Sequence, residues 1–253
     1  MVRIYLTGRL LIESPSCMVD EAGLGGRQCR LLFAYLVLER SRPAPIDELI
    51  DLLWPEEPPA QPHVSVRALV SRLRNSLDRV GTARDLLTTA SGCLQLQLPG
   101  AAFWIDFETA ATAVDAAEGM LRQGRPSEAF PLATTANAIS SRDFLPGEPA
   151  PWAVGRRAEL RGIRVRAMEA VIDIMCRVKQ WAVAVKVATD LVGLEPLRET
   201  AYEWLMQAQV GAGNRAEALR TYRRCQSILA EELGVSPSRQ LQSALERVLQ
   251  TSR

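Results

Sequence analysis

Residues 62–80 read PHVSVRALVSRLRNSLDRV, and their pattern is the strongest indication of the fold class. Its apolar residues recur at the spacing of one buried stripe on an α-helix: Val66, Leu69, Val70, Leu73, Leu77 and Val80. The opposite side carries four arginines against one acid, Asp78. This pattern predicts a helix that has one face in a protein core and a basic face directed outward.

The basic face contains candidate DNA-binding side chains. Guanidinium groups and short polar side chains suit phosphate oxygens and the base edges of a major groove. The candidates are Arg67, Ser71, Arg72, Arg74, Asn75 and Arg79. Helical phase alone does not divide them into base contacts and phosphate contacts. A solvated amphipathic helix without a ligand is the alternative interpretation of the same pattern.

Composition limits the classes of protein to consider. The 253 residues leave room for two domains, and a formal net charge of +1 requires any nucleic-acid surface to be local. Five scattered cysteines, no CxxC pair and a single histidine argue against a metal site or a disulfide framework. There is no cofactor motif, so we expect a protein that is not an enzyme and holds no cofactor. No signal peptide or membrane span is visible, which predicts a soluble cytoplasmic protein without membrane contacts.

Short strands and helices precede the basic helix. Alternating apolar residues at 2–13 predict two strands of a small antiparallel sheet. Helical patterns follow at 27–40 and 46–54, and a proline-rich loop that contains Glu56 and Glu57 leads to residue 62. A short helix, a connection and a second, basic helix form a helix-turn-helix arrangement.

A hairpin is predicted directly after the basic helix. Within residues 85–98, leucines alternate with glutamines, and Ser91 and Gly92 supply a turn. Such a hairpin is the wing of a winged helix. Residues 1–102 are therefore predicted to form an α+β winged-helix domain.

From residue 103 onward the pattern is helical. Residues 124–129 resemble residues 213–218, and a related phrase at 179–184 lies 34 residues before the latter. A turn followed by a small residue on a new helix, repeated at this period, is typical of tetratricopeptide repeats. Residues 103–253 are therefore predicted to form an all-α tetratricopeptide-like domain. Its expected helices are 107–123, 152–178, 181–194, 197–212, 215–233 and 237–249.

Six motifs occur in an order and spacing that match a known family. They are GGRQCRLL from Gly25, IDELIDLLW from Ile46, VSRLRNSL from Val70, WIDFE from Trp104, EPLRE from Glu195 and NRAEALRTYRRCQSILAEELGVSPS from Asn214. With these motifs the chain resembles the Streptomyces antibiotic regulatory protein family. That family joins a winged helix of the response-regulator type to a bacterial transcriptional activation domain.

The resemblance implies a transcriptional activator. In that family the helix corresponding to residues 62–80 enters the major groove, and the wing reaches toward the neighbouring minor groove. Members bind direct repeats as side-by-side copies and recruit RNA polymerase to promoters of antibiotic gene clusters. We therefore expect double-stranded promoter DNA, RNA polymerase and a second copy of the chain as partners. Glu56 and Glu57 lie in the loop that contacts polymerase in similar proteins, and a solvated acidic loop is the alternative interpretation.

The sequence departs from the family pattern at two places. Residues 88–93 lack the arginine and the Pro-Gly-Gly-Tyr turn of the family wing, so no cation is left at the tip for a minor groove. Pro45 replaces the usual hydroxyl residue before the second helix, and such a lost cap costs about 1 kcal/mol. An adaptor of the tetratricopeptide type, whose winged helix no longer binds DNA, is therefore the alternative function. Larger relatives append an ATP-binding or phosphopeptide-reading domain, which we do not expect here because the helical pattern ends near Leu249.

Overall fold

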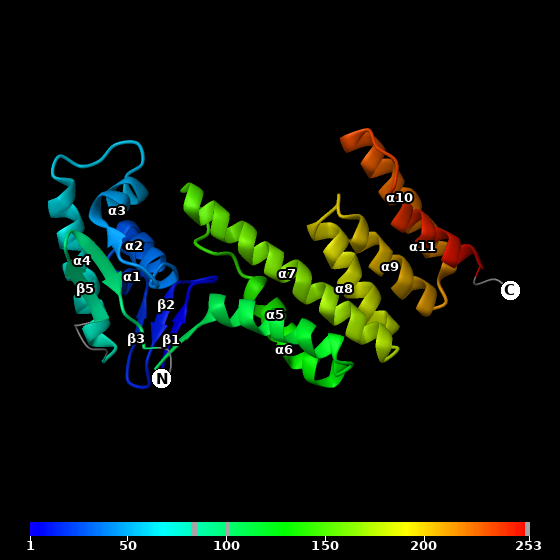
Figure 1. Ribbon diagram of the computed structural model, residues 1–253, viewed down its shortest axis with the longest axis horizontal. Coiled ribbons are helices and arrows are strands. Elements are labelled where there is room, and N and C mark those ends of the chain that lie inside the picture. Colours follow the sequence, from blue (N-terminus) through cyan, green and yellow to red (C-terminus); the bar gives the residue numbers. More distant parts are fainter. Residues whose placement is uncertain (82–85, 100–101, 251–253) are drawn as a thin grey trace. The chain divides into compact units, whose positions relative to one another are not determined.

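The computed structural model describes residues 1–81, 86–99 and 102–250. The chain divides into two compact units (Figure 1). The first contains Met1–Thr109 and Ile139–Leu160, and the second contains Ala110–Ala138 and Arg161–Arg253. The expected domain boundary after residue 102 stays a prediction, and the structure adds that a segment far along the chain packs with the N-terminal unit.

A four-stranded sheet forms one side of the first unit. Its strand order is β3-β2-β1-β7, and the strands are β1 (Val2–Tyr5), β2 (Leu11–Glu13), β3 (Met18–Asp20) and β7 (Phe103–Ile105). β1 pairs antiparallel with β2, and Ile4 lies opposite Ile105 in the parallel pair of β1 with β7. The sequence indicated only the first two strands, because a three-residue strand is too short to show alternation and β7 pairs with a segment about a hundred residues away.

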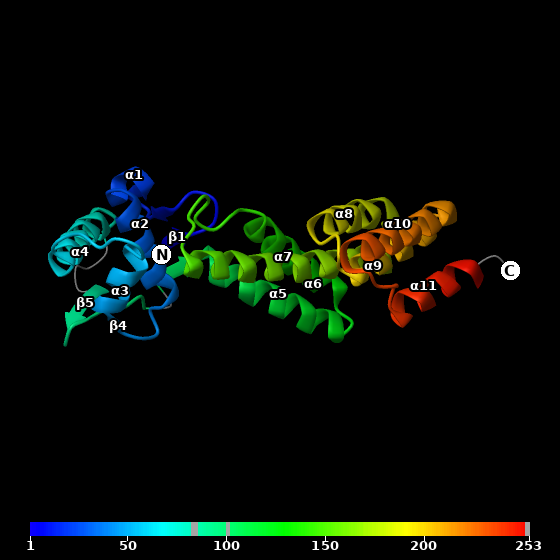
Figure 2. The same cartoon turned by 90° about the horizontal axis from the view of Figure 1, so that it is seen from above.

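Four helices pack beside this sheet: α1 (Glu21–Leu24), α2 (Arg27–Leu38), α3 (Ile46–Leu53) and α4 (Pro62–Arg79). α4 contacts α1, α2 and α3 (Figures 1 and 2). Pro62 begins α4, where its missing N–H leaves no helical hydrogen bond unmade. All six residues of the predicted apolar stripe are buried, with exposed fractions of 7% or less. The predicted two-faced helix is confirmed.

The predicted hairpin is formed by β5 (Leu87–Ala90) and β6 (Cys93–Leu96). Ser91 and Gly92 have φ values of 50° and 74°, and two positive φ angles match the turn whose twist suits a two-residue hairpin. Asp85, where the hairpin pattern begins, lies outside the described residues. A third strand, β4 (Ala44–Pro45), pairs with β6.

The missing cap before α3 is replaced by the hairpin turn. Pro45 makes no side-chain cap hydrogen bond, as its sequence position predicted. However, the backbone N–H of Ile46 donates to the carbonyl of Gly92 at 3.0 Å. One donor at the start of α3 is therefore satisfied by the wing, which links the wing to the helix before the loop that leads to α4.

The segment from Ile139 to Leu160 is built into the first unit through an aromatic cluster. Phe144 is fully buried, and its ring meets Phe107 and Trp152 edge to face at 5.8 Å. Trp152 in turn meets Tyr35 of α2 at 5.4 Å. The irregular character of residues 142–151 was visible in the sequence, but this packing was not.

An ion pair between half-exposed Arg27 and buried Glu148 holds the same segment. The carboxylate of Glu148, whose side chain is 1% exposed, accepts two hydrogen bonds from Arg27 at 2.6 and 2.9 Å. The N–H of Gly8 donates to the carbonyl of Asp143 at 2.7 Å. Both contacts join residues more than a hundred positions apart.

The second unit consists of helices that pack in successive pairs, as in tetratricopeptide proteins (Figures 1 and 2). The helices from residue 106 onward are α5 (Asp106–Arg122), α6 (Pro126–Ser140), α7 (Pro151–Arg177), α8 (Trp181–Leu194), α9 (Glu199–Gly211), α10 (Arg215–Leu233) and α11 (Arg239–Gln250). A Cβ atom on Gly211 would come within 2.4 Å of the indole ring of Trp181, so α8 and α9 approach closely only because Gly211 has no side chain. The predicted all-α tetratricopeptide-like architecture is confirmed.

Candidate nucleic-acid interface

The outward face of α4 is centred on three side chains. With 3.6 residues per turn, Val64, Ser71 and Asn75 project within roughly 40° of one another and away from buried Leu73. All three are exposed. Arg67 lies to one side of this centre and Arg72 to the other, and both are exposed. The face therefore presents a narrow central row between two guanidinium groups.

Three of the predicted DNA-binding residues have side chains that are open to a ligand. Among the residues that the structure describes, Arg67, Ser71 and Asn75 form no side-chain hydrogen bond or ion pair. Arg67 and Ser71 are one helical turn apart, as are Ser71 and Asn75. Donors and acceptors in this row can therefore be offered to a partner without breaking an internal contact.

Arg74 has a different environment, because it joins α4 to the hairpin. Its Nη2 donates to the carbonyl of Leu87 at 2.8 Å and to Oγ1 of Thr89 at 3.3 Å. Its Nε donates to the same carbonyl at 3.3 Å. Arg74 thus fixes β5 against the helix, a role that the helical pattern alone did not indicate.

Arg79 is also used within the unit. Its guanidinium donates to the carbonyl of Gly23 in α1 and to Oγ of Ser76. Ser76 is itself buried and donates to the same carbonyl at 3.0 Å. These contacts fasten the C-terminal end of α4 to α1.

Arg72 packs across the turn between α1 and α2. Its Cδ lies 3.6 Å from the position that a Cβ on Gly25 would take, and Gly25 has a φ of +95°. Burial raises the pKa of the neighbouring Cys29 thiol, and the positive charge of Arg72 opposes that rise. The guanidinium nevertheless stays at the surface, so Arg72 combines a structural contact with an exposed charge.

The loop between α3 and α4 and the tip of the hairpin flank this face. Glu56 and Glu57 are exposed, and neither forms an ion pair with a described residue. At the tip, Ala90, Ser91 and Gly92 are exposed. No cation stands among these tip residues, as the sequence predicted.

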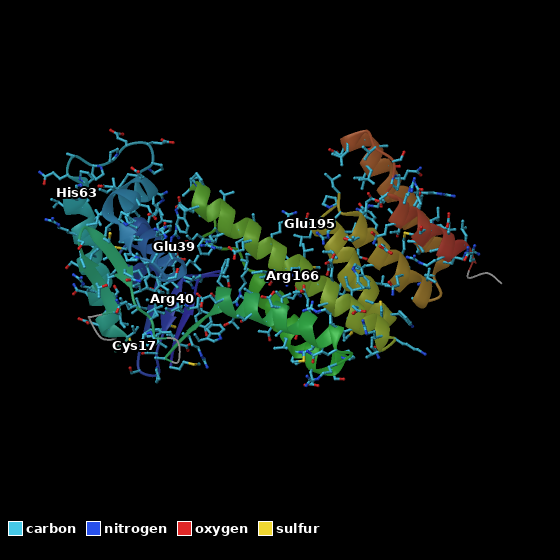
Figure 3. All side chains as sticks on the ribbon, in the orientation of Figure 1. Cys17, Glu39, Arg40, His63, Arg166 and Glu195 are labelled. Carbon is cyan, nitrogen blue, oxygen red and sulfur yellow. The ribbon has the colours of Figure 1, made fainter. Side chains whose placement is uncertain are left out.

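Two residues at the start of α4 were not among the predicted contacts. His63 is exposed, and its Nε2 lies 3.5 Å from Oδ1 of Asp47 (Figure 3). Val64 is 54% exposed although it is apolar. The sequence could have identified Val64 as an exposed apolar residue, because this valine lies outside the apolar stripe that begins at Val66.

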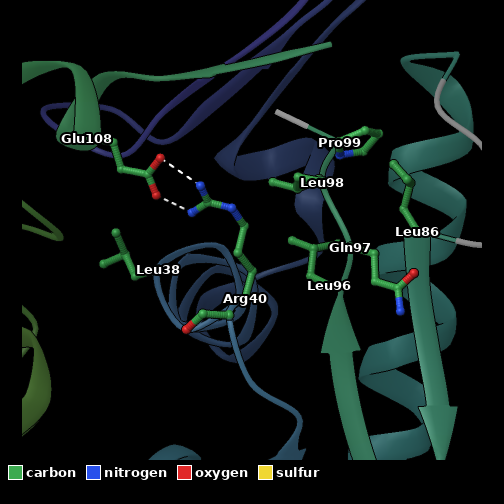
Figure 4. A pocket seen from close by; sticks show the side chains of 9 residues that line it. Leu38, Arg40, Leu86, Leu96, Gln97, Leu98, Pro99 and Glu108 are labelled. Atoms are coloured by element: carbon green, nitrogen blue, oxygen red, sulfur yellow. Dashed lines mark hydrogen bonds and ion pairs between the residues drawn. The ribbon is translucent and has the colours of Figure 1, made fainter. Parts of the chain in front are cut away.

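A separate hollow of about 830 Å³ lies at the base of the hairpin (Figure 4). It is lined by Leu38, Arg40, Ser41, Leu86, Leu96, Gln97, Leu98, Pro99 and Glu108. Arg40 and Glu108 form a bidentate ion pair in its wall, with one contact at 2.7 Å. These two charges neutralise each other, and the rest of the lining is mostly apolar, with four leucines and Pro99 beside Ser41 and Gln97.

Comparison with known proteins places this geometry in a family. Residues 105–249 match the bacterial transcriptional activator domain. The chain belongs to this family. The match and the relatives also confirm the prediction that the chain is a member of the Streptomyces antibiotic regulatory protein family.

The relatives that match this chain are regulatory proteins, and several of them are transcriptional regulators. The regulatory protein AfsR of Streptomyces coelicolor is 36% identical over 228 residues, which are 89% of this chain and 22% of AfsR. The transcriptional regulatory protein EmbR of Mycobacterium tuberculosis is 30% identical over 227 residues, which are 87% of this chain and 57% of EmbR. The chain therefore spans about a fifth of AfsR and just over half of EmbR.

A solved structure confirms the fold class. Mycobacterium tuberculosis EmbR, in complex with a low-affinity phosphopeptide, matches this chain with a TM-score of 0.90 at 24% identity. The match covers 100% of this chain and 66% of the EmbR chain. A winged helix of the response-regulator type followed by a tetratricopeptide-like helical domain is thus the fold. Within the described residues, no helix combines the length and the hydropathy that a membrane crossing requires.

Proposed function

We propose that this protein is a sequence-specific DNA-binding activator of transcription, and that α4 lies in the major groove of its operator. The observation that carries the proposal is the outward row of Arg67, Ser71 and Asn75. These side chains are exposed and unpaired among the described residues, on the second helix of a helix-turn-helix in a family of transcriptional activators. A major groove admits one α-helix, and its base edges offer partners for each of these side chains.

The arginines then have separate roles. Arg67 reaches a guanine edge or a phosphate, and Arg72 reaches a backbone phosphate at the other side of the helix. Arg74 and Arg79 act as positioning residues, because their hydrogen bonds set the angle of α4 to the wing and to α1. The wing approaches the minor groove with hydroxyl and backbone groups only, so its contribution to affinity is small.

The proposed partners follow from the family. Two copies of the chain bind side by side on a direct repeat upstream of a promoter of a secondary-metabolite gene cluster, in the cytoplasm. Glu56 and Glu57 contact RNA polymerase, which is supported by their exposure and by their place in the loop before α4. The helical unit supports the arrangement of the two copies.

The test is a gel shift with promoter DNA from beside the protein's own gene, at two salt concentrations and with unrelated competitor DNA. We expect binding that survives competitor and that falls steeply as salt rises, because phosphate contacts release counterions. Folded protein without specific binding at either salt would refute the proposal and favour the adaptor. A search for protein partners of residues 106–253 would then follow.

Two variants separate the roles within the face. Arg67→Ala should weaken operator binding by about 1–3 kcal/mol if the contact is to a base, with no change in the free energy of unfolding. Arg74→Ala should weaken binding and also destabilise the fold, by about 1 kcal/mol, because three hydrogen bonds to the hairpin are lost from a half-buried group. Arg223→Ala, an exposed arginine on α10, is the matched control and should change neither quantity.

A further inference from the structure

Val64 is an apolar side chain at the centre of a polar face. It is 54% exposed, in the first turn of α4, and it projects roughly opposite the core residue Leu73. A valine at such a position adds nothing to the core, and its β-branched side chain lowers helix propensity slightly. Folding alone therefore does not explain a valine here.

The neighbours of Val64 define a small apolar strip beside a guanidinium. Ala68 lies one turn further along the helix and is exposed. Arg67 stands between the two in sequence and projects to one side of them. The strip is thus two aliphatic side chains long, with a hydrogen-bond donor at its edge and polar Ser71 beyond it.

We propose that Val64 and Ala68 read the C5-methyl groups of thymines in the operator. This inference rests on the proposed function and names the bases that the face selects. The thymine methyl is the one apolar group that base pairs present in the major groove, and aliphatic side chains recognise it by contact. The flanking charges of Arg67 and Arg72 favour a polyanion over an apolar protein surface as the occupant. A half-site that fits this face has thymine within one or two base pairs of the base that Arg67 contacts.

The N-terminal position of the pair supports this assignment. Recognition helices of this class contact base edges mainly through their N-terminal residues, while later residues turn away from the groove. Val64 and Ala68 lie in the first two turns of an 18-residue helix. Arg74 and Arg79, in the later turns, form internal hydrogen bonds instead.

Uracil substitution tests the inference at single positions. Replacing one thymine by uracil removes only the methyl group and keeps every hydrogen-bonding group of the base. We expect one or two uracil positions in each half-site to weaken binding of the wild-type protein about three- to fivefold, the effect of one buried methyl-sized group. Uracil at other positions should leave the dissociation constant unchanged.

The variant Val64→Ser links the effect to the residue. Serine has a helix propensity close to that of valine, so the variant should fold normally, which circular dichroism checks. It should bind the natural operator more weakly and should no longer distinguish thymine from uracil at the sensitive position. Val154→Ser replaces another exposed valine, 49% exposed on α7, and should keep the wild-type discrimination.

The outcomes separate this inference from the proposed function. Specific binding that is insensitive to uracil at every thymine would overturn the inference and leave the proposed function standing. Unchanged discrimination at every sensitive position in the Val64→Ser variant would overturn the assignment to Val64, because the methyl would then be read by Ala68 or by another residue. A folded wild-type protein without specific binding would overturn both.

Discussion

Among the polar residues of the first unit, Asp106 is expected to be the one whose substitution lowers the free energy of unfolding most. Its side chain is fully buried at the junction of β7 and α5. One carboxylate oxygen accepts the N–H groups of Leu6 and Phe107 at 2.8 and 2.7 Å. The other accepts the N–H and the hydroxyl of Thr7 at 3.0 and 2.7 Å. The substitution Asp106→Asn keeps the size of the side chain and removes one of its acceptor oxygens.

The loss in the free energy of unfolding follows from these four hydrogen bonds. The amide nitrogen of asparagine faces the N–H of Thr7, and a buried donor left without a partner costs roughly 1–3 kcal/mol. The hydroxyl of Thr7 can rotate and accept from the amide, so this contact survives. The bonds from Leu6 and Phe107 become neutral, and charge-assisted bonds are about twice as strong as neutral ones. We expect Asp106→Asn to lower the free energy of unfolding by about 2–4 kcal/mol.

Urea denaturation of the full chain measures the effect. Three of the five tryptophans, Trp54, Trp104 and Trp152, lie in the first unit, while Trp181 and Trp204 lie in the second. The midpoint of the first unit's fluorescence transition should fall while its slope stays the same, and the transition of the second unit should not move. Asp51→Asn, at an exposed position of α3, is the matched control and should change stability by less than about 0.5 kcal/mol. If Asp106→Asn is as stable as this control, the reasoning from the four hydrogen bonds is wrong.

Two further predictions concern packing and pH. Gly211→Ala should destabilise the second unit by about 1–3 kcal/mol despite its higher helix propensity, because the new methyl would overlap the ring of Trp181. Urea denaturation would show this against Gly193→Ala, where the added methyl meets open space and should be neutral or stabilising by up to about 1 kcal/mol. Burial, and next the hydrogen bond to Glu48, raises the pKa of Tyr35 to about 12. An unfolded tyrosine titrates near about pH 10, so stability from this group is present below that pH and is lost between about 10 and about 12. Denaturation at several alkaline pH values should show a shallower decline for Tyr35→Phe, and an unchanged decline would contradict the assignment.

Helix α4 illustrates how much of the structure the sequence predicts. The apolar stripe of α4 was visible because the period of a helix is local, and all six of its residues are buried. The turn at Ser91 and Gly92 was visible for the same reason, since the turn type depends on the residues that adopt it. The family motifs then gave the order of the domains.

The sequence predicted less of the candidate site than of the fold. The pattern placed Arg67 and Arg74 on one basic face, but it did not show that Arg74 donates to the hairpin while Arg67 has no partner among the described residues. The difference depends on a carbonyl of Leu87, thirteen positions away in another element. A helical pattern contains no information about such a neighbour.

The element types, the buried faces and the family of this protein could thus be predicted from the sequence, because each depends on short-range periodicity or on motifs. The folded structure was needed to show which arginines are anchored, that β7 pairs with β1, and that Glu148 binds Arg27 in the N-terminal unit. The pairing of β1 with β7 and the ion pair of Arg27 with Glu148 join residues about a hundred or more positions apart, whereas Arg74 and Leu87 are thirteen positions apart in different elements. Their strength comes from burial and from hydrogen-bond geometry, and both exist only after the chain has folded.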